Sequence, residues 1–327
     1  MSMPPPSSHQ LLIPFAATSS PACRETLRTL ALPRLSQLLT RLTRTHADEG
    51  DEYTLTPPHE RALARAQGLT AADGQLPWAA WQAAFHSRPE PALDAARDAM
   101  AWITPCHWHV ATDHITMSDP AALQLGAAES QALLAAMQPY FTQDGISLHY
   151  GQPTRWLAAS EVFRGLATAS LDRVLGRNVD AWMPEAAQAA PLRRLQNEMQ
   201  MLLYTHPIND ARIERGLLPV NSFWVSGAGA LATPLPPASA RTEVAAPRTL
   251  AEPALREDWD AWARAWQQLD STEIAAALTA VEQKSALTLT LCGERSAHTF
   301  EALPQGLGAR ISSIFGRKSL SDGLLLL

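Results

Sequence analysis

The sequence predicts an α/β fold, a three-layer sandwich in which helices cover both faces of a mixed β-sheet. Short apolar runs that favour strands alternate with helical patterns along the chain of 327 residues, without an internal repeat. Two of these runs, at 146–159 and 285–303, have the spacing of antiparallel strand pairs, so the strands cannot all be parallel. Hydrophobic residues make up 46% of the chain and charged residues 18%, which is enough apolar material for a large core.

The predicted strands are short segments rich in apolar, aromatic and β-branched residues. The first is LLIPFA, and the second is a strand pair or one long, broken strand in AWITPCHWHVATDHITM. A hairpin, a buried strand that ends in glycine and a final antiparallel pair follow. In chain order, these predicted strands occupy residues 11–16, 101–117, 146–159, 220–229 and 285–303.

Helices are predicted where apolar residues recur at spacings of three and four. Start and stop signals support several of them: proline opens the helix that ends at Gly68, Pro33 breaks another, and Asp270 precedes Glu273 in a capping pattern. An acidic loop is predicted at 46–52. In chain order, the predicted helices occupy residues 22–42, 56–69, 76–85, 118–141, 160–176, 189–205, 256–269 and 270–283.

The composition changes along the chain in a way that predicts one main domain with accessory segments. A leader rich in proline and serine is predicted to be disordered, and a stretch rich in proline and alanine is predicted to be a linker or long loop. The predicted organisation is a disordered leader at 1–10, a main α/β domain at 11–231, the linker at 232–255, a C-terminal α/β segment at 256–303 that completes the same domain, and a tail at 304–327.

Charge, hydropathy and cysteine usage exclude several classes of protein. The net charge of −6 argues against a nucleic-acid binder, which needs Lys and Arg to neutralise phosphates. No stretch approaches 18 uninterrupted apolar residues, so no membrane span or signal peptide is expected. The three cysteines, Cys23, Cys106 and Cys292, are odd in number and widely spaced, which predicts no disulfide framework and favours a reducing, cytoplasmic location.

The segment PCHWHVATDH is a candidate metal site. In a regular strand His107 and His109 point to the same face, and two imidazoles at this spacing can share one divalent transition metal. Asp113 and His114 could add ligands across a turn, whereas Cys106 would point away. The alternative is that these imidazoles hydrogen-bond backbone and water on a half-buried strand, and no HExxH or paired CxxC motif favours the metal.

A second candidate region follows the helix predicted at 189–205, where uncharged polar residues gather. Ligands of α/β sheets bind outside the carboxyl ends of strands, and Gly227 and Gly229 would let backbone N–H groups approach an anion there. The alternative is that these glycines serve a tight turn. This region and the histidine segment would form one pocket if their two strands are neighbours. The ligand-binding candidates are Asn197, His206, Asn209, Asp210, Asn221, Ser222 and Trp224.

Three arginines in the helix predicted at 160–176 and just after it add a further candidate. Arg164, Arg173 and Arg177 could bind a phosphate or a carboxylate. Alternatively, they pair with nearby acids such as Glu161 and Asp172. Of these, Arg164 is taken as the candidate ligand contact.

Four segments together resemble a known protein group. The segments at 56–69, 105–117, 163–179 and 197–229 are similar to RpfE-type regulatory proteins of proteobacteria, which are described as phosphoglycerate-mutase-like, and the resemblance covers about residues 11–300. NSFWVSGAG is also similar to an Asn-x-x-Trp-x-x-Gly-x-Gly stretch of cofactor-independent phosphoglycerate mutases. This resemblance implies an alkaline-phosphatase/phosphoglycerate-mutase-like scaffold.

The resemblance includes one departure that bears on activity. Such enzymes carry a metal-binding aspartate at the end of their first strand, whereas this chain reads LLIPFAATSS there. A two-metal site needs several carboxylate ligands. The resulting hypothesis is a cytoplasmic regulatory or ligand-sensing protein on a catalytically degenerate scaffold, with a small phosphorylated or anionic ligand and an unknown cofactor.

Two alternatives stay open at this point. One is an active metal-dependent phosphohydrolase or phosphomutase that uses His107, His109, Asp113, His114 and His206 as ligands or as acid/base groups, with a divalent metal held by the first four. The other is a structural module that binds a protein partner. For that module, the tryptophan-rich helix with Trp259, Trp262 and Trp266 would be the partner surface.

Overall fold

The computed structural model describes residues 9–85, 93–94, 97–231, 243–302 and 323–327. The chain forms two compact units. Unit 1 consists of Met1–Leu69 and Pro237–Leu327, and unit 2 consists of Thr70–Pro236. The predicted main domain over 11–231 is therefore divided between two units: its first part belongs with the C-terminal segment at 256–303, which lies in the same sheet.

Unit 1 contains a mixed five-stranded sheet in the order β2-β11-β10-β1-β9. β1 runs parallel to both β9 and β10, while β10, β11 and β2 pair antiparallel. The prediction of an α/β fold with a mixed sheet is confirmed. The strands of this sheet are β1 (His9–Ile13), β2 (Thr43–Asp48), β9 (Val244–Ala245), β10 (Leu287–Cys292) and β11 (Ala297–Glu301).

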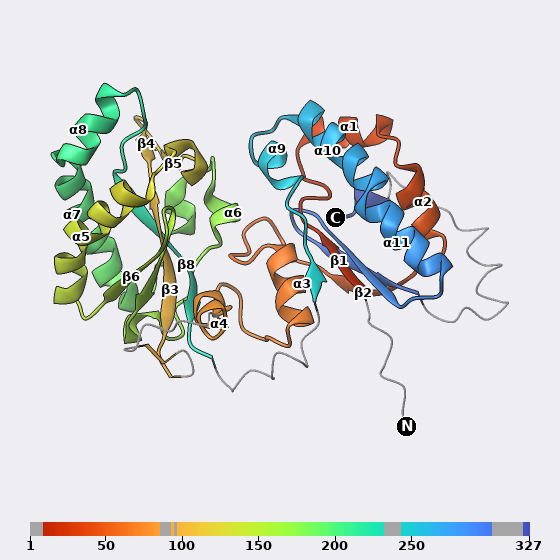
Figure 1. The fold of residues 1–327 in the computed structure, drawn as a ribbon, viewed down its shortest axis with the longest axis horizontal. Coiled ribbons are helices and arrows are strands. Elements are labelled where there is room, and N and C mark those ends of the chain that lie inside the picture. Colours follow the sequence, from red (N-terminus) through yellow and green to blue (C-terminus); the bar gives the residue numbers. More distant parts are fainter. Residues whose placement is uncertain (1–8, 86–92, 95–96, 232–242, 303–322) are drawn as a thin grey trace. The chain divides into compact units, whose positions relative to one another are not determined.

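Helices cover both faces of the unit 1 sheet, which gives the predicted three layers (Figure 1). Because side chains alternate along a strand, Leu11 and Ile13 enter the core beneath four helices, and Leu12 contacts Ala62 of α3 on the other face. The four helices on the first face are α1 (Pro21–Thr29), α2 (Pro33–Leu39), α10 (Trp259–Ser271) and α11 (Glu273–Glu282); α3 (Pro58–Ala66) lies on the second face, and the short α9 (Ala251–Leu255) precedes α10.

The tryptophans of α10 are part of this core. Trp262 and Trp266 are both fully buried. Their indole N–H groups donate to the carbonyls of Phe15 and Ala16, at 3.0 and 3.3 Å. Trp262 and Trp266 therefore have no exposed surface for a partner, whereas Trp259 is half-buried, and the partner surface on this helix stays a prediction.

Unit 2 is built on a four-stranded antiparallel sheet in the order β6-β7-β3-β8. A separate pair, β4 and β5, follows β3 directly, as expected for the broken strand predicted at 101–117. The hairpin predicted at 146–159 is also present. These strands are β3 (Met100–Cys106), β4 (Trp108–Val110), β5 (Ile115–Met117), β6 (Ser147–Gln152), β7 (Arg155–Ala159) and β8 (Ser222–Gly229).

The sheet of unit 2 also lies between helices. Leu133 of α5 and Leu195 of α7 pack with Ile103 on one face, and Ala80 of α4 packs with Met100 on the other. The helices of unit 2 are α4 (Trp78–Ala83), α5 (Ala127–Gln143), α6 (Leu171–Val174), α7 (Ala190–Tyr204) and α8 (Pro207–Glu214). Short 3₁₀ turns lie at η1 (Pro120–Leu123), η2 (Glu161–Phe163), η3 (Val179–Trp182) and η4 (Ala187–Ala189).

Three predicted elements differ from the structure. The helix predicted at 118–141 is interrupted: η1 ends just before Gln124, whose φ of +50° is left-handed, and α5 begins only at Ala127. The helix predicted at 160–176 is wrong: η2 ends near Gly165, whose φ of +68° is left-handed, and α6 begins only after Ser170. The start of the acidic loop predicted at 46–52 belongs to β2. The leader at 1–8, part of the linker at 232–242 and most of the tail at 303–322 lie outside the described residues.

No helix in the described ranges combines the length and the apolar character that a bilayer crossing requires.

Candidate functional site

The two polar regions predicted from the sequence meet in unit 2, because β3 and β8 are paired neighbours. The histidine segment continues from β3, and the segment before β8 runs beside it. Nδ1–H of His107 donates to the Pro219 carbonyl at 2.8 Å. Asn221 donates to the Trp108 carbonyl at 2.8 Å and accepts from the Trp108 N–H at 2.7 Å. The polar groups thus bind one another's backbones.

Asn209 has the same structural role between α7, α8 and β8. Its amide nitrogen donates to the carbonyls of Leu203 and Val220, at 2.8 and 2.7 Å, and its oxygen accepts from the Val220 N–H at 2.9 Å. The side chain is only 2% exposed. Because these bonds use both of its amide protons and its oxygen, Asn209 holds the α7–α8 corner onto the start of β8.

The other candidates from this region differ in burial and in their hydrogen-bond partners. Trp224 is buried and donates to the Ala169 carbonyl at 3.1 Å, and Ser222 is buried with no partner for its hydroxyl among the described atoms. Asn197 and Asp210 are exposed. His206 caps α8, where its Nδ1 accepts from the Ile208 N–H at 3.3 Å.

Sequence reasoning missed Gln196, the neighbour of Asn197. Gln196 is buried and donates to the Phe223 carbonyl at 3.3 Å. It lies four residues after Leu192 and three before Met199, on the apolar stripe of α7. The position of Gln196 on that stripe could have identified it as a buried residue, because the helical period places Gln196 inward and Asn197 outward.

Arg164 lies in the loop after η2 and pairs with Glu161. Its guanidinium donates to both carboxylate oxygens of Glu161, at 2.7 and 2.8 Å, and to the Arg97 carbonyl at 2.8 Å. This hydrogen bond lowers the pKa of the Glu161 carboxyl. For Arg164, the pairing agrees with the alternative that the sequence left open.

The four predicted metal ligands do not converge as the structure stands. His109 lies on β4 with an exposed side chain, and His114 hydrogen-bonds the neighbouring Asp113 at 2.7 Å. That bond lowers the pKa of the exposed Asp113 carboxyl. The bond from His107 Nδ1–H to a carbonyl is of the kind that orients metal-binding imidazoles. However, no three of the four bring ligand atoms within 4.8 Å of one another. Metal binding here stays a prediction.

The two glycines at the end of β8 are explained by packing. Gly227 has a φ of +61°, and a Cβ there would lie 3.0 Å from the Trp102 ring and 3.1 Å from Trp78. A Cβ on Gly229 would lie 2.9 Å from the Pro77 side chain. Trp78 of α4 and Trp102 of β3 thus pack closely against Gly227.

A different polar cluster lies in unit 1, at the carboxyl ends of the parallel strands β1 and β10. The N–H of Ser19 donates to a carboxylate oxygen of Glu294 at 2.9 Å, and the Ser19 hydroxyl donates to the same oxygen. Ser19 follows β1, and Glu294 lies in the turn between β10 and β11. This edge is where α/β sheets place their ligands, and the cluster holds an anionic group with one backbone and one side-chain donor.

The loop between β1 and Ser19 is held rigidly by α10. Phe15 has a φ of +56°, which is uncommon for a residue other than glycine. Trp262 and Trp266 donate to the carbonyls of Phe15 and Ala16, as described above, and the Ala16 N–H donates to the Cys292 carbonyl at 2.7 Å. These hydrogen bonds therefore fix the backbone that precedes Ser19.

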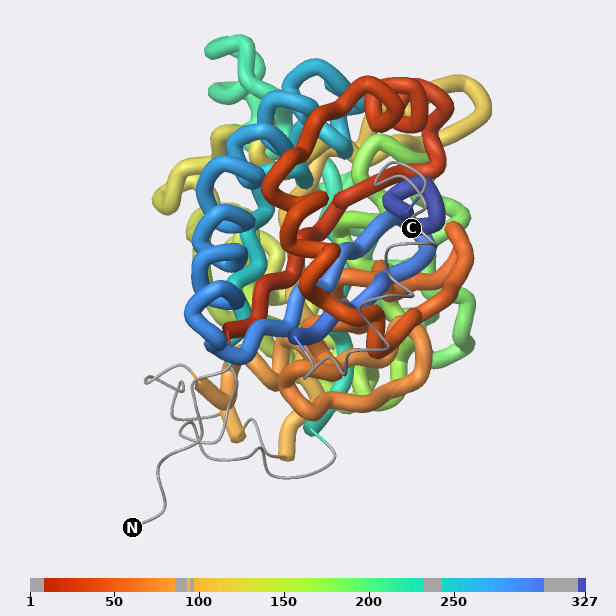
Figure 2. The backbone as a smooth tube through the Cα atoms, turned by 90° about the vertical axis from the view of Figure 1, so that its right-hand side faces the viewer, coloured from red at the N-terminus to blue at the C-terminus, as the bar shows by residue number. Residues whose placement is uncertain are grey.

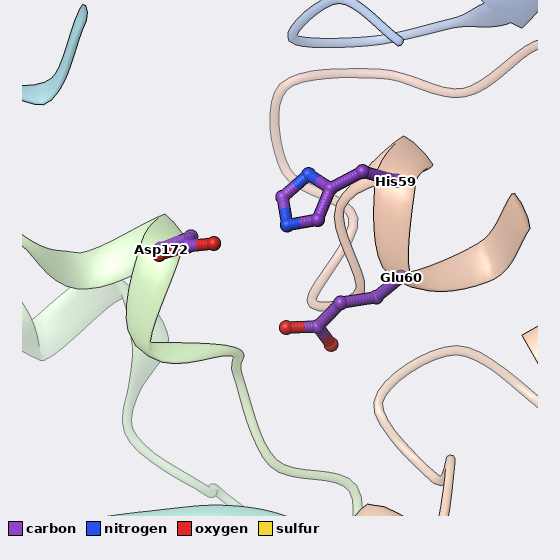
Figure 3. A group of neighbouring side chains, drawn as sticks. All are labelled: His59, Glu60 and Asp172. Atoms are coloured by element: carbon purple, nitrogen blue, oxygen red, sulfur yellow. The ribbon is translucent and has the colours of Figure 1, made fainter. Parts of the chain in front are cut away.

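Charged side chains on α3 border the same sheet. Arg61 donates to both carboxylate oxygens of Asp48, at 3.3 and 3.1 Å, and to the Thr56 carbonyl at 2.6 Å. His59 and Glu60 extend from the first turn of α3 (Figure 3). Asp172, labelled in the same picture, belongs to α6 of unit 2. Within each unit, no three described His, Cys, Asp or Glu side chains have their ligand atoms within 4.8 Å of one another.

The cysteines add no nucleophile or metal ligand to either cluster. Cys23, Cys106 and Cys292 are free thiols, and all three are buried. Burial raises the pKa of each thiol. They therefore stay protonated at neutral pH and behave as small apolar residues.

Comparison with known proteins supports a phosphoglycerate-mutase-like scaffold. A probable 2,3-bisphosphoglycerate-independent phosphoglycerate mutase of Geobacter sulfurreducens is 28% identical over 116 residues, which is 35% of this chain and 29% of that protein. The corresponding enzyme of Methanosarcina mazei is 25% identical over 122 residues, 37% of this chain and 31% of the enzyme. The chain thus matches less than a third of the length of these relatives. No protein-family model matches it.

Two solved structures are similar to the chain at low sequence identity. A cofactor-independent phosphoglycerate mutase of Thermoplasma acidophilum matches with a TM-score of 0.36 and 12% identity, over 97% of this chain and 98% of that structure. The PH0037 protein of Pyrococcus horikoshii matches with a TM-score of 0.42 and 10% identity, over 90% of this chain and 87% of that structure.

Proposed function

We propose that this chain is a regulatory or ligand-sensing protein on a catalytically degenerate phosphoglycerate-mutase-like scaffold, related to the RpfE-type regulatory proteins that it resembles. The end of β1 carries this proposal. Where the resembled enzymes have a metal-binding aspartate, this chain has a loop without any carboxylate, fixed by Trp262 and Trp266. A two-metal reaction centre needs several carboxylates close together.

The proposed ligand is a small phosphorylated or anionic molecule that binds at the carboxyl ends of β1 and β10. The contact of Ser19 with Glu294 supports this assignment, because the N–H and the hydroxyl of Ser19 already donate to an anionic oxygen, that of the Glu294 carboxylate. Backbone N–H and hydroxyl groups are also the usual partners of phosphate oxygens. Asn209, Asn221 and Trp224 are weaker candidates, since protein groups use their hydrogen bonds.

We place the protein in the cytoplasm, where free buried thiols such as Cys106 stay reduced. The net charge of −6 supports a small ligand or a protein partner over a nucleic acid.

A binding and turnover experiment tests the proposal. The purified chain is heated with 3-phosphoglycerate, with and without Mn²⁺, and conversion to 2-phosphoglycerate is measured in parallel. A ligand that binds only the folded protein raises Tm. We expect a rise in Tm without turnover, and no rise with glycerate, which lacks the phosphate. Absence of any rise with 3-phosphoglycerate, inorganic phosphate or other small phosphorylated acids contradicts the proposal.

The active phosphohydrolase or phosphomutase is the alternative function, and the names of the relatives favour it. This alternative predicts turnover that chelation abolishes. Elemental analysis of the freshly purified protein provides a second test, since about one or more equivalents of Zn, Mn or Fe would support the enzyme.

A further inference from the structure

The turn between β10 and β11 contacts a segment that is remote in sequence. Within the turn, the Gly293 N–H donates to the Ser296 carbonyl at 2.9 Å. The N–H groups of Ser296 and Arg295 both donate to the Leu327 carbonyl, at 2.9 and 3.3 Å. Leu324 and Leu327 are 2% and 7% exposed and belong to the core of unit 1. Figure 2 shows this segment, 323–327, in dark blue beside the blue strands of unit 1.

Gly293 lets the segment approach this closely. A Cβ at this position would lie 2.5 Å from the carbonyl carbon and from the Cβ of Leu327. Real Cβ atoms do not make such contacts, so a side chain at Gly293 and a docked Leu327 exclude each other. Gly293 has no left-handed backbone conformation. Alanine there is therefore compatible with the turn, and its steric effect falls on Leu327.

The same turn contacts the proposed anion site. Glu294, between Gly293 and Arg295, accepts the N–H and the hydroxyl of Ser19. The Arg295 carbonyl accepts from Arg61 at 3.3 Å. The tight turn at 293–296 therefore contacts both the docked segment and Ser19.

We propose that the segment 323–327 is a built-in regulatory element that keeps the anion site closed. While it is docked, it fixes the turn so that Glu294 occupies the donors of Ser19. When it leaves, Glu294 is released, and a phosphate or carboxylate ligand gains Ser19 together with the N–H groups of Arg295 and Ser296. This inference rests on the proposed function for its ligand, whereas the coupling between Leu327 and Glu294 can be measured without any ligand.

A double-mutant cycle tests the coupling. Glu294→Gln is introduced into the native chain and into Gly293→Ala, and urea midpoints are compared. We expect Glu294→Gln to lower the midpoint in the native chain and to leave it unchanged in Gly293→Ala, where the contact with Ser19 is already lost. Gly323→Ala is the matched control, because a Cβ there meets nothing within 4 Å. Equal decreases in both backgrounds overturn the proposal.

If Gly293→Ala folds poorly, hydrogen exchange of a second variant tests the same coupling between Leu327 and the turn. Leu327→Asp removes the docked side chain without changing the turn sequence. We expect the Ser296 amide to exchange about tenfold faster in Leu327→Asp and the Leu12 amide of β1 to keep its native rate. An unchanged rate at Ser296 shows that the segment does not hold the turn and overturns the proposal.

Ligand titration separates this inference from the proposed function. With 3-phosphoglycerate as the probe, we expect Gly293→Ala to bind about tenfold more tightly than the native chain, and Ser19→Ala to cancel the gain. Equal binding by both forms overturns the regulatory element and leaves the proposed function standing. Coupling in the mutant cycle without binding by either form supports the element and contradicts the proposed ligand.

Discussion

The two units use similar polar residues for different purposes, and strand direction explains the difference. In unit 1 the neighbours β9, β1 and β10 run parallel, so their carboxyl ends lie at one edge, where Ser19 meets Glu294. In the described part of unit 2, every pair of strands is antiparallel. Consecutive loops then leave the sheet at opposite edges, and polar side chains such as Asn209 hold neighbouring segments together. In unit 2, the polar side chains beside the antiparallel strands thus act as structural ties.

The largest effect is expected where the unit 1 loop is held in place. Trp266→Ala removes a fully buried indole and the hydrogen bond to Ala16, and should lower the free energy of unfolding by about 4 kcal/mol. Trp266→Phe keeps most of the apolar contact, and its smaller loss isolates the hydrogen bond. Urea denaturation with hydrogen exchange measures both variants. Equal stability of Trp266→Ala and the native chain would contradict the role of α10.

The ties of unit 2 should be nearly as important for stability. Asn209→Ala leaves two carbonyls and one N–H of the buried α7–α8 corner without their partner, which should cost about 3 kcal/mol. The exposed Asn197→Ala is the control, with an expected change below about 0.5 kcal/mol. Hydrogen exchange should show the loss in unit 2 peptides. If Asn209→Ala instead removes 3-phosphoglycerate binding at unchanged stability, the site assignment moves to unit 2.

Acid should affect unit 2 through Glu129. Burial raises the pKa of this carboxyl, but the hydrogen bond from Arg215 and the charge of the buried Arg212 outweigh it, and the net pKa lies below its ordinary value of 4.5. The stabilisation is therefore complete above about pH 4.5 and is lost as the pH falls through the lowered pKa. Glu129→Gln should cost about 2 kcal/mol at neutral pH and flatten the acid limb of the stability profile. An unchanged acid limb would exclude Glu129 as its source.

The smallest effect is expected for the histidine segment. His107→Ala/His109→Ala removes the bond to the Pro219 carbonyl and should cost about 1 kcal/mol. Metal content should be the same before and after the change, as elemental analysis will show. Loss of about one equivalent of metal in the double variant would make PCHWHVATDH a metal site and would favour the enzyme over the sensor.

Local elements of this fold could be predicted from the sequence, but the contacts that its polar residues make could not. The stripe of Leu195 and Met199 and the glycine-ended strand at 220–229 indicated α7 and β8 correctly. The helix predicted at 160–176 failed because Gly165 takes a left-handed conformation that helical periodicity does not reveal.

The candidate sites depended on contacts between distant segments. The sequence indicated His107 and Asn221 as candidate site residues, and their regions do lie close together. Only the pairing of β3 with β8 shows that the two regions form hydrogen bonds with each other. The contact of Ser19 with Glu294 spans 275 positions. No local pattern contains that information, because it arises from which strands become neighbours in the sheet.

The central sheet of unit 1 also has a consequence for synthesis of the chain. His9 of β1 pairs with Leu287 of β10, and all of unit 2 lies between them in the sequence. Because synthesis proceeds at about 5–20 residues per second, roughly tens of seconds pass between the synthesis of β1 and that of its partner β10. Unit 2 can fold during that interval, whereas the apolar segment LLI stays exposed. Chaperone capture or aggregation of the nascent chain should therefore concentrate on residues 11–13, and refolding of unit 1 should be the slower of the two.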